Sequence, residues 1–367
     1  MKITKIPGLG NYGVYIDNVD FDHLSDEEWL EIGKIHLKNL VTIIRKTSLN
    51  QNTLMERMLR FGEPRYNLKN MMIKKYNISF EDIVTLAEIN DPLIDQIDVD
   101  AINALYNTQE KTDHNGYDVG KVAGGYDKQG RPKGLFAEGE LLWHSNESGT
   151  LTWTPGVALL GHRGVKGSAT CFMTTADWYE KQTENFRSEL DEMILIHRFT
   201  PGKINPGLNQ QQDAIMKANM CPDSEKEIPM VIQSPGGIRG LHYSINTVSQ
   251  VKGMSQKDSD RLFRKLNKEL FVEEYQYDHW YKNNGDLLLF DNSITLHRRL
   301  GKTDGRLCYR VAHDYTNLQD EPYQPYFIPE YQRQYNREIT MLIKIAGIKN
   351  FKLPKLGLIE RIKNVFD

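Results

Sequence analysis

The feature that most constrains this chain is a series of short apolar segments between residues 141 and 315. The segments are rich in β-branched and aromatic residues and are separated by glycine, proline, asparagine or aspartate, which is the pattern of strands joined by turns. They read GVALLGH, GSATCFMTT, IPMVIQS, GLHYSI, GDLLLFDN and RLCYRVAHDY. Many strands at this spacing favour a sandwich or barrel. We therefore expect a mainly β fold.

Helices are expected to flank these strands, which makes the fold class mainly β with flanking helices (α+β). Ser25 precedes three acidic residues and predicts a capped helix in LSDEEWLEIGKIHLKN, followed by a strand in LVTIIR. The segment SLNQNTLMERMLRFGEP predicts a second helix that ends at Gly62 and Pro64. Two further helices are expected within the strand-rich part, in TADWYEKQTENFRSELDEMILIH and SQKDSDRLFRKLNKELF. At the N-terminus, MKITKI and YGVYIDNV predict two strands around a turn.

The chain is expected to form one elaborated domain over residues 1–320. Residues 66–140 are less regular and are interpreted as an inserted lid or loop region, and residues 206–224 as a second loop near the site. Residues 337–367 are basic and amphipathic, and residues 321–367 are expected to form a helical extension. Its apolar residues suffice for packing on the body or on a second subunit, so a homo-oligomer is allowed.

Composition excludes several classes of function. A net charge of −3, without any stretch that interleaves Lys or Arg with aromatic residues, gives no support for nucleic acid as a partner. The three cysteines form no CxxC motif, which favours a reducing compartment. There is no apolar run typical of a signal peptide or long enough to span a membrane. We therefore predict a cytoplasmic protein that acts on a small-molecule substrate.

One glycine motif has to be set aside. Gly8, Gly10 and Gly13 form a GxGxxG pattern, which in dinucleotide-binding proteins precedes a helix whose N-terminus binds the pyrophosphate. The residues that follow, VYIDNV, are those of a strand. No dinucleotide site is expected here.

Two histidines are the candidate metal ligands. His144 follows the apolar LLW and precedes a polar turn, and His297 ends the strand-like GDLLLFDNSITLH. A lone histidine in such a position is more often structural than functional. Two histidines on separate strands of a β-sandwich, however, can converge on one ion, and imidazole binds iron, zinc, copper and nickel. The pair therefore predicts a metal site.

Two arginines are the candidate anion-binding residues. Arg306 and Arg310 lie four positions apart in RLCYR, and residues at that spacing on a strand point to the same face. A guanidinium in an enclosed cavity usually binds a carboxylate, because its planar group makes two charge-assisted hydrogen bonds. The alternative is a surface pair beside a hairpin.

Five segments together resemble the taurine dioxygenase superfamily (TauD/TfdA-like). The stretch from LSDEEWLEIGKIHLKNLVTIIR to RFGEP is similar to the opening helix, strand and RFG signature of that family. WHSN stands where the family has WHTD, and GSATCFMTT matches its GGDT segment. GDLLLFDNSITLH resembles the strand of the distal histidine, and RLCYR the closing Arg-xxx-Arg. Order and approximate spacing hold over residues 1–65 and 141–315.

This resemblance implies a double-stranded β-helix core (jelly roll, cupin-like) with Fe(II), 2-oxoglutarate and O2 as cofactor and co-substrates. His144 and His297 would then be iron ligands, and Arg310 with Thr170 would bind the distal carboxylate of 2-oxoglutarate. Arg306 would face the co-substrate or an anionic group on the prime substrate. Two histidines and a carboxylate on one face of octahedral iron leave positions for a chelating 2-oxo acid and for oxygen.

The chain departs from the family at the third ligand, because Asn146 occupies the position of the family's carboxylate and Glu147 follows it. Glu147 could bind iron if a turn or bulge reorients it, since neighbouring residues on a regular strand point to opposite faces. Asn146 could bind through its amide oxygen, directly or through a water. Halide could fill the position, as in related halogenases, although those have a smaller residue there. A degenerate site without redox activity is the fourth alternative.

The predicted function is a 2-oxoglutarate-dependent oxygenase that hydroxylates a C–H bond of a small, anionic or zwitterionic molecule, with succinate and CO2 as co-products. The alternatives are a 2-oxoglutarate-dependent halogenase and a catalytically silent β-helix that binds a ligand. Hydrolytic zinc chemistry would leave the arginine pair without a role. Tyr243 is a candidate wall of the substrate site, and Trp143, Trp153 and Phe172 are further candidates.

Overall fold

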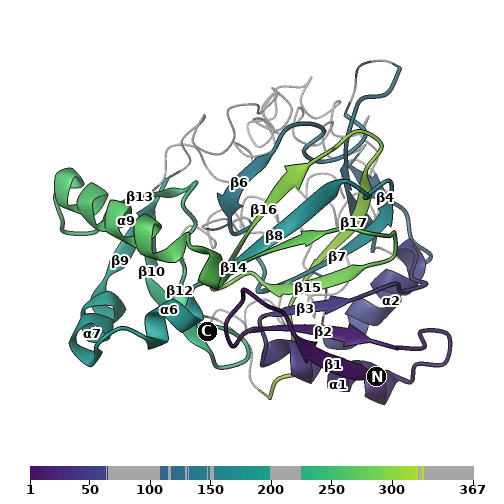
Figure 1. Cartoon of the computed structure of the whole chain (residues 1–367), viewed down its shortest axis with the longest axis horizontal. Coiled ribbons are helices and arrows are strands. Elements are labelled where there is room, and N and C mark those ends of the chain that lie inside the picture. The colour runs from purple at the N-terminus through teal and green to yellow at the C-terminus, as the bar shows by residue number, and fades with distance from the viewer. Residues whose placement is uncertain are drawn as a thin grey trace, which may run out of the picture.

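The computed structural model describes residues 1–62, 64, 108–114, 117–128, 130, 132–146, 148, 153–198, 225–320, 323 and 325. Its centre is a pair of facing β-sheets (Figure 1). The major sheet has eight strands, in the order β1 (Lys2–Lys5), β2 (Gly13–Asp17), β3 (Val41–Ile44), β15 (Leu287–Asp291), β7 (Gly156–Arg163), β17 (Leu307–His313), β5 (Val119–Ala123) and β4 (Gln109–Glu110). The minor sheet has four, in the order β14 (Gln276–Trp280), β8 (Ser168–Thr174), β16 (Thr295–Gly301) and β6 (Leu141–His144).

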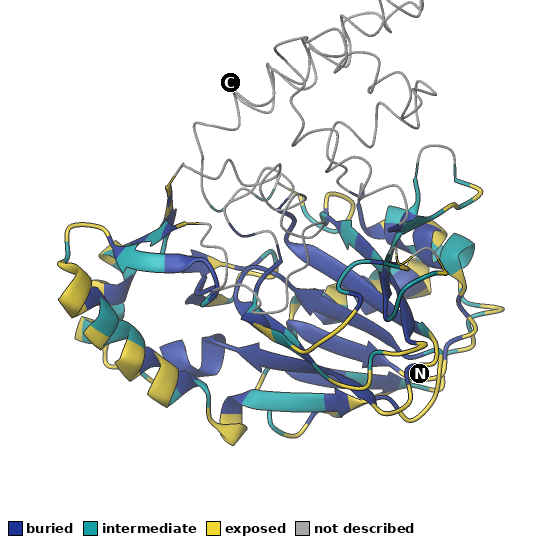
Figure 2. Ribbon diagram, turned by 90° about the horizontal axis from the view of Figure 1, so that it is seen from above, coloured by how far each residue is buried: buried dark blue, intermediate teal, exposed yellow. Residues whose placement is uncertain are grey.

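The central strands β3, β15 and β7 of the major sheet are buried on both faces along nearly all of their length, which explains their continuous apolar runs. In β15, Leu288 and Phe290 face the minor sheet, whereas Leu287 and Leu289 face the helices on the other side. The space between the sheets is filled by a cluster that includes Phe172 of β8 and Phe290, whose ring centroids lie 5.2 Å apart. Figure 2 shows the central strands buried along most of their length, with exposed residues on the surrounding helices and loops.

Helices α1 (Asp26–Leu37) and α2 (Gln51–Phe61) cover the outer face of the major sheet. Both begin at a residue whose side chain accepts hydrogen bonds from the first turn, Ser25 for α1 and Asn50 for α2, so the expected helix starts are confirmed. The ring of Trp29 stacks on that of Phe61 at 4.8 Å, which fixes the two helices to each other. The two helices thus cover the face of the major sheet that points away from the minor sheet.

The outer face of the minor sheet packs against a second group of elements (Figure 1). These are α6 (Ala176–Glu180), α7 (Glu184–Glu192), α9 (Gln256–Leu270), a short 3-10 helix η1 (Glu273–Tyr275), and the strands β9 (Ile194–His197), β10 (Lys226–Pro229), β11 (Val231–Gln233), β12 (Arg239–Leu241) and β13 (Val248–Val251). The single helix expected from residue 175 onward is wrong. Thr183 caps a new helix by accepting a hydrogen bond from the Phe186 amide, and the last residues form β9.

The N-terminal strands and the glycine motif agree with the sequence interpretation. β2 pairs antiparallel with β1 along one edge and parallel with β3 along the other. Gly8 and Gly10 have positive φ angles of 87° and 55° and form the turn before β2. No helix follows the motif.

Part of residues 66–140 is described, and it belongs to the major sheet. β5 pairs with β17, and β4 pairs with β5 at the edge. The sequence analysis did not predict these strands, because the pattern VGKVA contains a glycine and a lysine and β4 is only two residues long. Residues 65–107, the predicted loop at 206–224 and, apart from Tyr323 and Pro325, the predicted C-terminal extension lie outside the described residues.

The architecture is the expected one, a mainly β fold with flanking helices and a two-sheet double-stranded β-helix core. In the described part of the chain, no helix is both long and apolar enough to cross a membrane.

Candidate active site

His144 and His297 are brought together by strand pairing. β6 and β16 are neighbours in the minor sheet, and the two histidines are direct cross-strand partners. Their ring centroids lie 4.2 Å apart. The His297 ring also lies 4.7 Å from that of Phe290, a residue of the core between the sheets, so this histidine points into the sandwich.

The environment keeps both imidazoles neutral. Desolvation lowers the pKa of His144 to about 4, and this value includes smaller lowering contributions from the Arg310 and Arg299 guanidiniums. Burial also lowers the pKa of His297 well below its usual value, with smaller contributions from His144 and Arg310. His144 Nδ1 lies 2.7 Å from the main-chain oxygen of Leu142, which can only accept, so Nδ1 carries the hydrogen and Nε2 presents a lone pair.

The turn after β6 is held by the side chain of Asn292. Its Oδ1 accepts from the Asn146 amide at 2.7 Å, and its Nδ2 donates to the main-chain oxygens of Asn146 at 2.9 Å and Thr154 at 2.8 Å. Asn292 is fully buried, and Ser145 donates its hydroxyl to the Asn292 main-chain oxygen at 2.8 Å. The main chain at residue 146 is therefore fixed two positions beyond His144. Glu147 lies outside the described residues.

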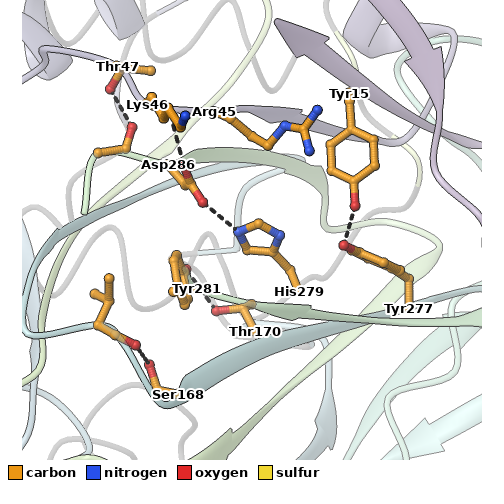
Figure 3. Close-up of polar contacts among 12 residues, drawn as sticks. Tyr15, Arg45, Lys46, Thr47, Ser168, Thr170, Tyr277, His279, Tyr281 and Asp286 are labelled. Carbon is orange, nitrogen blue, oxygen red and sulfur yellow. Dashed lines mark hydrogen bonds and ion pairs between the residues drawn. The ribbon is translucent and has the colours of Figure 1, made fainter. Parts of the chain in front are cut away.

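A second polar cluster lies between the sheets around Thr170. The hydroxyls of Thr170 and Tyr281 are 3.0 Å apart, and Arg306 Nη2 donates to Thr170 Oγ1 at 3.4 Å. Figure 3 shows the Tyr281 phenol directed at Thr170. Arg306 is 2% exposed, and its Nε has no hydrogen-bond partner among the described residues. No described carboxylate lies within ion-pair distance of this guanidinium.

Arg310 lies elsewhere in the same interior. It is four residues further along β17, and its charge lowers the pKa values of both His144 and His297. The sequence analysis assigned Thr170 to Arg310, whereas the structure brings Thr170 against Arg306. The strand register accounts for this difference. Thr170 pairs with Arg299 on β16, two positions beyond His297, and at this level it contacts Arg306.

The structure also shows residues that the sequence analysis did not select. Arg299 is buried and donates to the main-chain oxygens of Phe136 at 2.7 Å and Glu138 at 3.0 Å, as well as to that of Gly139, which anchors the segment before β6. In the sequence, Arg299 could be recognised only as a charged residue within a predicted strand. Tyr281 and Asn292 carried no sequence signal beyond their places beside strands.

The aromatic residues predicted to line the substrate site are core residues where their packing is described. Tyr243 and Trp143 pack on the outer face of the minor sheet, and Tyr243 donates its hydroxyl to Asn267 of α9 at 3.0 Å. Phe172 lies in the core between the sheets. Trp153 is buried beside His242, with ring centroids 6.0 Å apart. The expectation for Tyr243 is wrong, because its side chain, two residues after the end of β12, packs in the outer cluster and reaches α9.

The donors present are suited to a transition metal. Two neutral imidazoles face each other, and His297 Nδ1 is buried without a hydrogen-bond partner among the described residues. The described residues, which do not include Glu147, contain no group of three or more His, Cys, Asp or Glu side chains placed so that together they could bind a metal ion. Asn146, two positions after His144 in the turn that Asn292 holds, carries an amide oxygen. Imidazole and an oxygen donor fit divalent iron.

A double-stranded β-helix with a histidine pair and a buried, unneutralised arginine defines a metal-dependent oxygenase barrel rather than a dinucleotide or hydrolytic fold. Over residues 2–312 the sequence matches the model of the family described as taurine catabolism dioxygenase TauD, TfdA family. The chain belongs to this family. It is therefore a non-haem iron, 2-oxoglutarate-dependent dioxygenase, and it uses Fe(II), 2-oxoglutarate and O2.

Solved structures with this fold agree. A taurine dioxygenase from Burkholderia xenovorans is 18% identical, with 85% of this chain and 89% of that chain covered and a TM-score of 0.55. The structure of AAD-2 in complex with Mn(II) and N-oxalylglycine is 16% identical, with 88% and 100% covered and a TM-score of 0.55. A putative alpha-ketoglutarate dependent 2,4-D dioxygenase from Burkholderia xenovorans is 17% identical, with 85% and 97% covered and a TM-score of 0.54. Identities this low show a shared fold alone. A search of curated protein sequences gave no match.

Proposed function

We propose that this dioxygenase hydroxylates a C–H bond of a small anionic or zwitterionic molecule, with succinate and CO2 as co-products. The buried Arg306 guanidinium, which lacks a described carboxylate partner, supports the requirement for 2-oxoglutarate, and the Arg310 charge near the two histidines supports an anionic group on the substrate. A buried charge without a counter-ion is strongly destabilising, so the cavity is built to receive an anion. Bound Fe(II) supplies the oxidising chemistry, and the chain positions the reactants around it.

The distal carboxylate of 2-oxoglutarate is assigned to Arg306, Thr170 and Tyr281. Both hydroxyls and the guanidinium converge there and can donate hydrogen bonds to one carboxylate. Arg310, whose charge acts on the histidines, is proposed to face an anionic group of the substrate near the reacting centre. This exchanges the roles expected from the order of the two arginines in the sequence.

His144 and His297 are assigned as metal ligands, and Asn146 as the third, directly or through a water. The fixed main chain at residue 146 supports Asn146, and Glu147 is the alternative. A neutral third ligand leaves the metal with one less negative charge than a carboxylate would, so metal binding is expected to be weaker than with aspartate.

The test is an anaerobic titration of the metal-free protein with Fe(II) and 2-oxoglutarate, followed by the visible charge-transfer band of the chelate. Wild type is compared with Asn146→Ala, Glu147→Ala and Asn146→Asp. We expect a band in wild type, its loss in Asn146→Ala alone, and tighter iron binding in Asn146→Asp. Loss in Glu147→Ala alone would assign the third ligand to Glu147. A protein that binds no iron at stoichiometric concentration would be a catalytically silent β-helix.

Substrate oxidation separates hydroxylation from halogenation. Asn146 fills the position that a halide would need, so we expect succinate formation to be independent of chloride. Turnover that requires chloride and yields a chlorinated product would instead assign the halogenase activity.

A further inference from the structure

A second pocket lies at the seam where the edges of the two sheets meet, outside the site described above. Its volume is ≈ 690 Å³. It is lined by residues of β1 and β2, the chain after β3, β14 and the turn after β14: Lys2, Tyr15, Asp17, Asn18, Val19, Arg45, Lys46, Tyr277, His279, Trp280, Lys282, Asn283 and Asp286. None of the residues assigned to metal or 2-oxoglutarate is among them. Pockets of this size accept small molecules rather than a macromolecule.

The charges of this seam pocket are predominantly positive although the whole chain has a net charge of −3. Four cationic side chains face two carboxylates. Both carboxylates already have partners: Asp17 accepts hydrogen bonds from Arg45, and Asp286 forms an ion pair with His279 at 3.0 Å. Lys2, Lys46 and Lys282 form no ion pair within the described part of the chain. Three ammonium groups are therefore available to a ligand.

The floor and wall of the pocket are rigid. His279 and Asp286 are 4% exposed each, and Asp286 also accepts the Lys46 amide at 2.9 Å. Tyr15 and Tyr277 meet through their hydroxyls across the seam, and the Arg45 guanidinium lies 4.4 Å from the centre of the Tyr15 ring (Figure 3). A binding site whose fixed groups are already oriented loses less entropy when a ligand binds.

We propose that the seam pocket binds a small organic polyanion, a molecule with at least two carboxylate or phosphate groups. Three ammonium groups at one rigid pocket match several negative charges better than one. The indole of Trp280, 48% exposed at the rim, adds an apolar surface for the carbon skeleton of such a ligand. On β14 His279 pairs with Thr170 of β8, so the pocket and the Thr170–Arg306 cluster lie on neighbouring strands but have separate linings.

The test uses the full-length chain without added metal, so its outcome does not depend on oxygenase activity. Isothermal titration at low salt is done with tricarballylate, a tricarboxylate, and in parallel with fructose 1,6-bisphosphate; acetate is the monovalent control. We expect saturable binding of at least one polyanion and none of acetate. Binding of only one of the two would identify the ligand as a carboxylate or a phosphate compound.

Variants locate the binding. Lys46→Gln/Lys282→Gln should weaken binding about tenfold, as expected from the loss of two partly exposed charge interactions. The matched variant Lys257→Gln/Lys268→Gln removes the same charge from exposed positions of α9 and should bind as wild type does. Equal weakening in both variants would reduce the effect to net charge and overturn the proposal. So would the absence of saturable binding of either polyanion.

Discussion

Substitution of Asn292 tests whether the turn at residue 146 positions a metal ligand. Asn292→Ala removes the acceptor of the Asn146 amide and the donors to the main-chain oxygens of Asn146 and Thr154. All three bonds are buried, and at about 1 kcal/mol each their loss should lower the free energy of unfolding by about 3 kcal/mol. The groups left unpaired at residue 146 are also expected to disorder the turn.

Asn292→Ala should also lower the affinity of the protein for metal. Side chains that support a metal ligand typically change affinity about 10–100-fold when removed. We therefore expect Asn292→Ala to weaken Mn(II) or Fe(II) binding at least about tenfold, measured by anaerobic calorimetry beside urea denaturation. Asn292→Asp is the matched variant, because it keeps the acceptor for the Asn146 amide but loses both donated bonds.

Two results would refute this reasoning. Unchanged stability in Asn292→Ala would show that the three hydrogen bonds contribute little. Lost stability with wild-type metal affinity would show that residue 146 is not held for the metal, and would favour Glu147 or a two-histidine site.

Further predictions concern the arginines, the buried ion pair, a close approach and pH. Arg306→Lys should raise the Kd for 2-oxoglutarate about tenfold or more, because lysine lacks the planar guanidinium that makes two hydrogen bonds to a carboxylate. Arg310→Lys should leave this Kd nearly unchanged. The opposite result for the two variants would restore the assignment made from the sequence. Asp286→Asn should lower the free energy of unfolding by about 2–3 kcal/mol in urea, because it leaves His279 without its charged partner, and a change within error would contradict this. Gly124→Ala should cost at least about 2 kcal/mol in the same assay, because a Cβ there collides with the main-chain oxygen of Thr303. Burial lowers the pKa of His36 to about 3 from its usual 6.5, so the unfolded chain takes up this proton at a higher pH than the folded chain does. The contribution of His36 to the free energy of unfolding should therefore be fully present above pH 6.5 and decrease as the pH drops toward 3. In thermal melts from pH 8 to 4.5, His36→Gln should show a smaller loss of stability with falling pH than wild type.

The strands that carry the site could be predicted because their burial is written in their sequences. β7, β8, β15 and β17 are nearly continuous apolar runs bounded by turn residues, and their order matched a known family. β4 and β5 could not be predicted in the same way. They are held at the sheet edge by pairing with β17, a long-range contact that leaves no local periodicity.

The histidine pair could be inferred, but the partner of Thr170 could not. Arg306 and Arg310 share one face of a strand, so nothing in the sequence distinguishes which of them reaches Thr170. The register of β8 on β16 decides it. Tyr281 joins the cluster from the turn after β14, far away in sequence, and its contribution depends entirely on the fold.

The Asn292 side chain contacts residue 146 only through main-chain atoms, while the two histidines are set by the pairing of β6 with β16. The position proposed for the third ligand is thus specified without regard to which side chain occupies it. Such a site is modular: one substitution at residue 146 can alter the charge and coordination of the metal without changes elsewhere in the barrel. This separation offers a simple route by which descendants of one scaffold acquire different oxidative reactions, and it makes residue 146 the first position to vary in directed evolution of this enzyme.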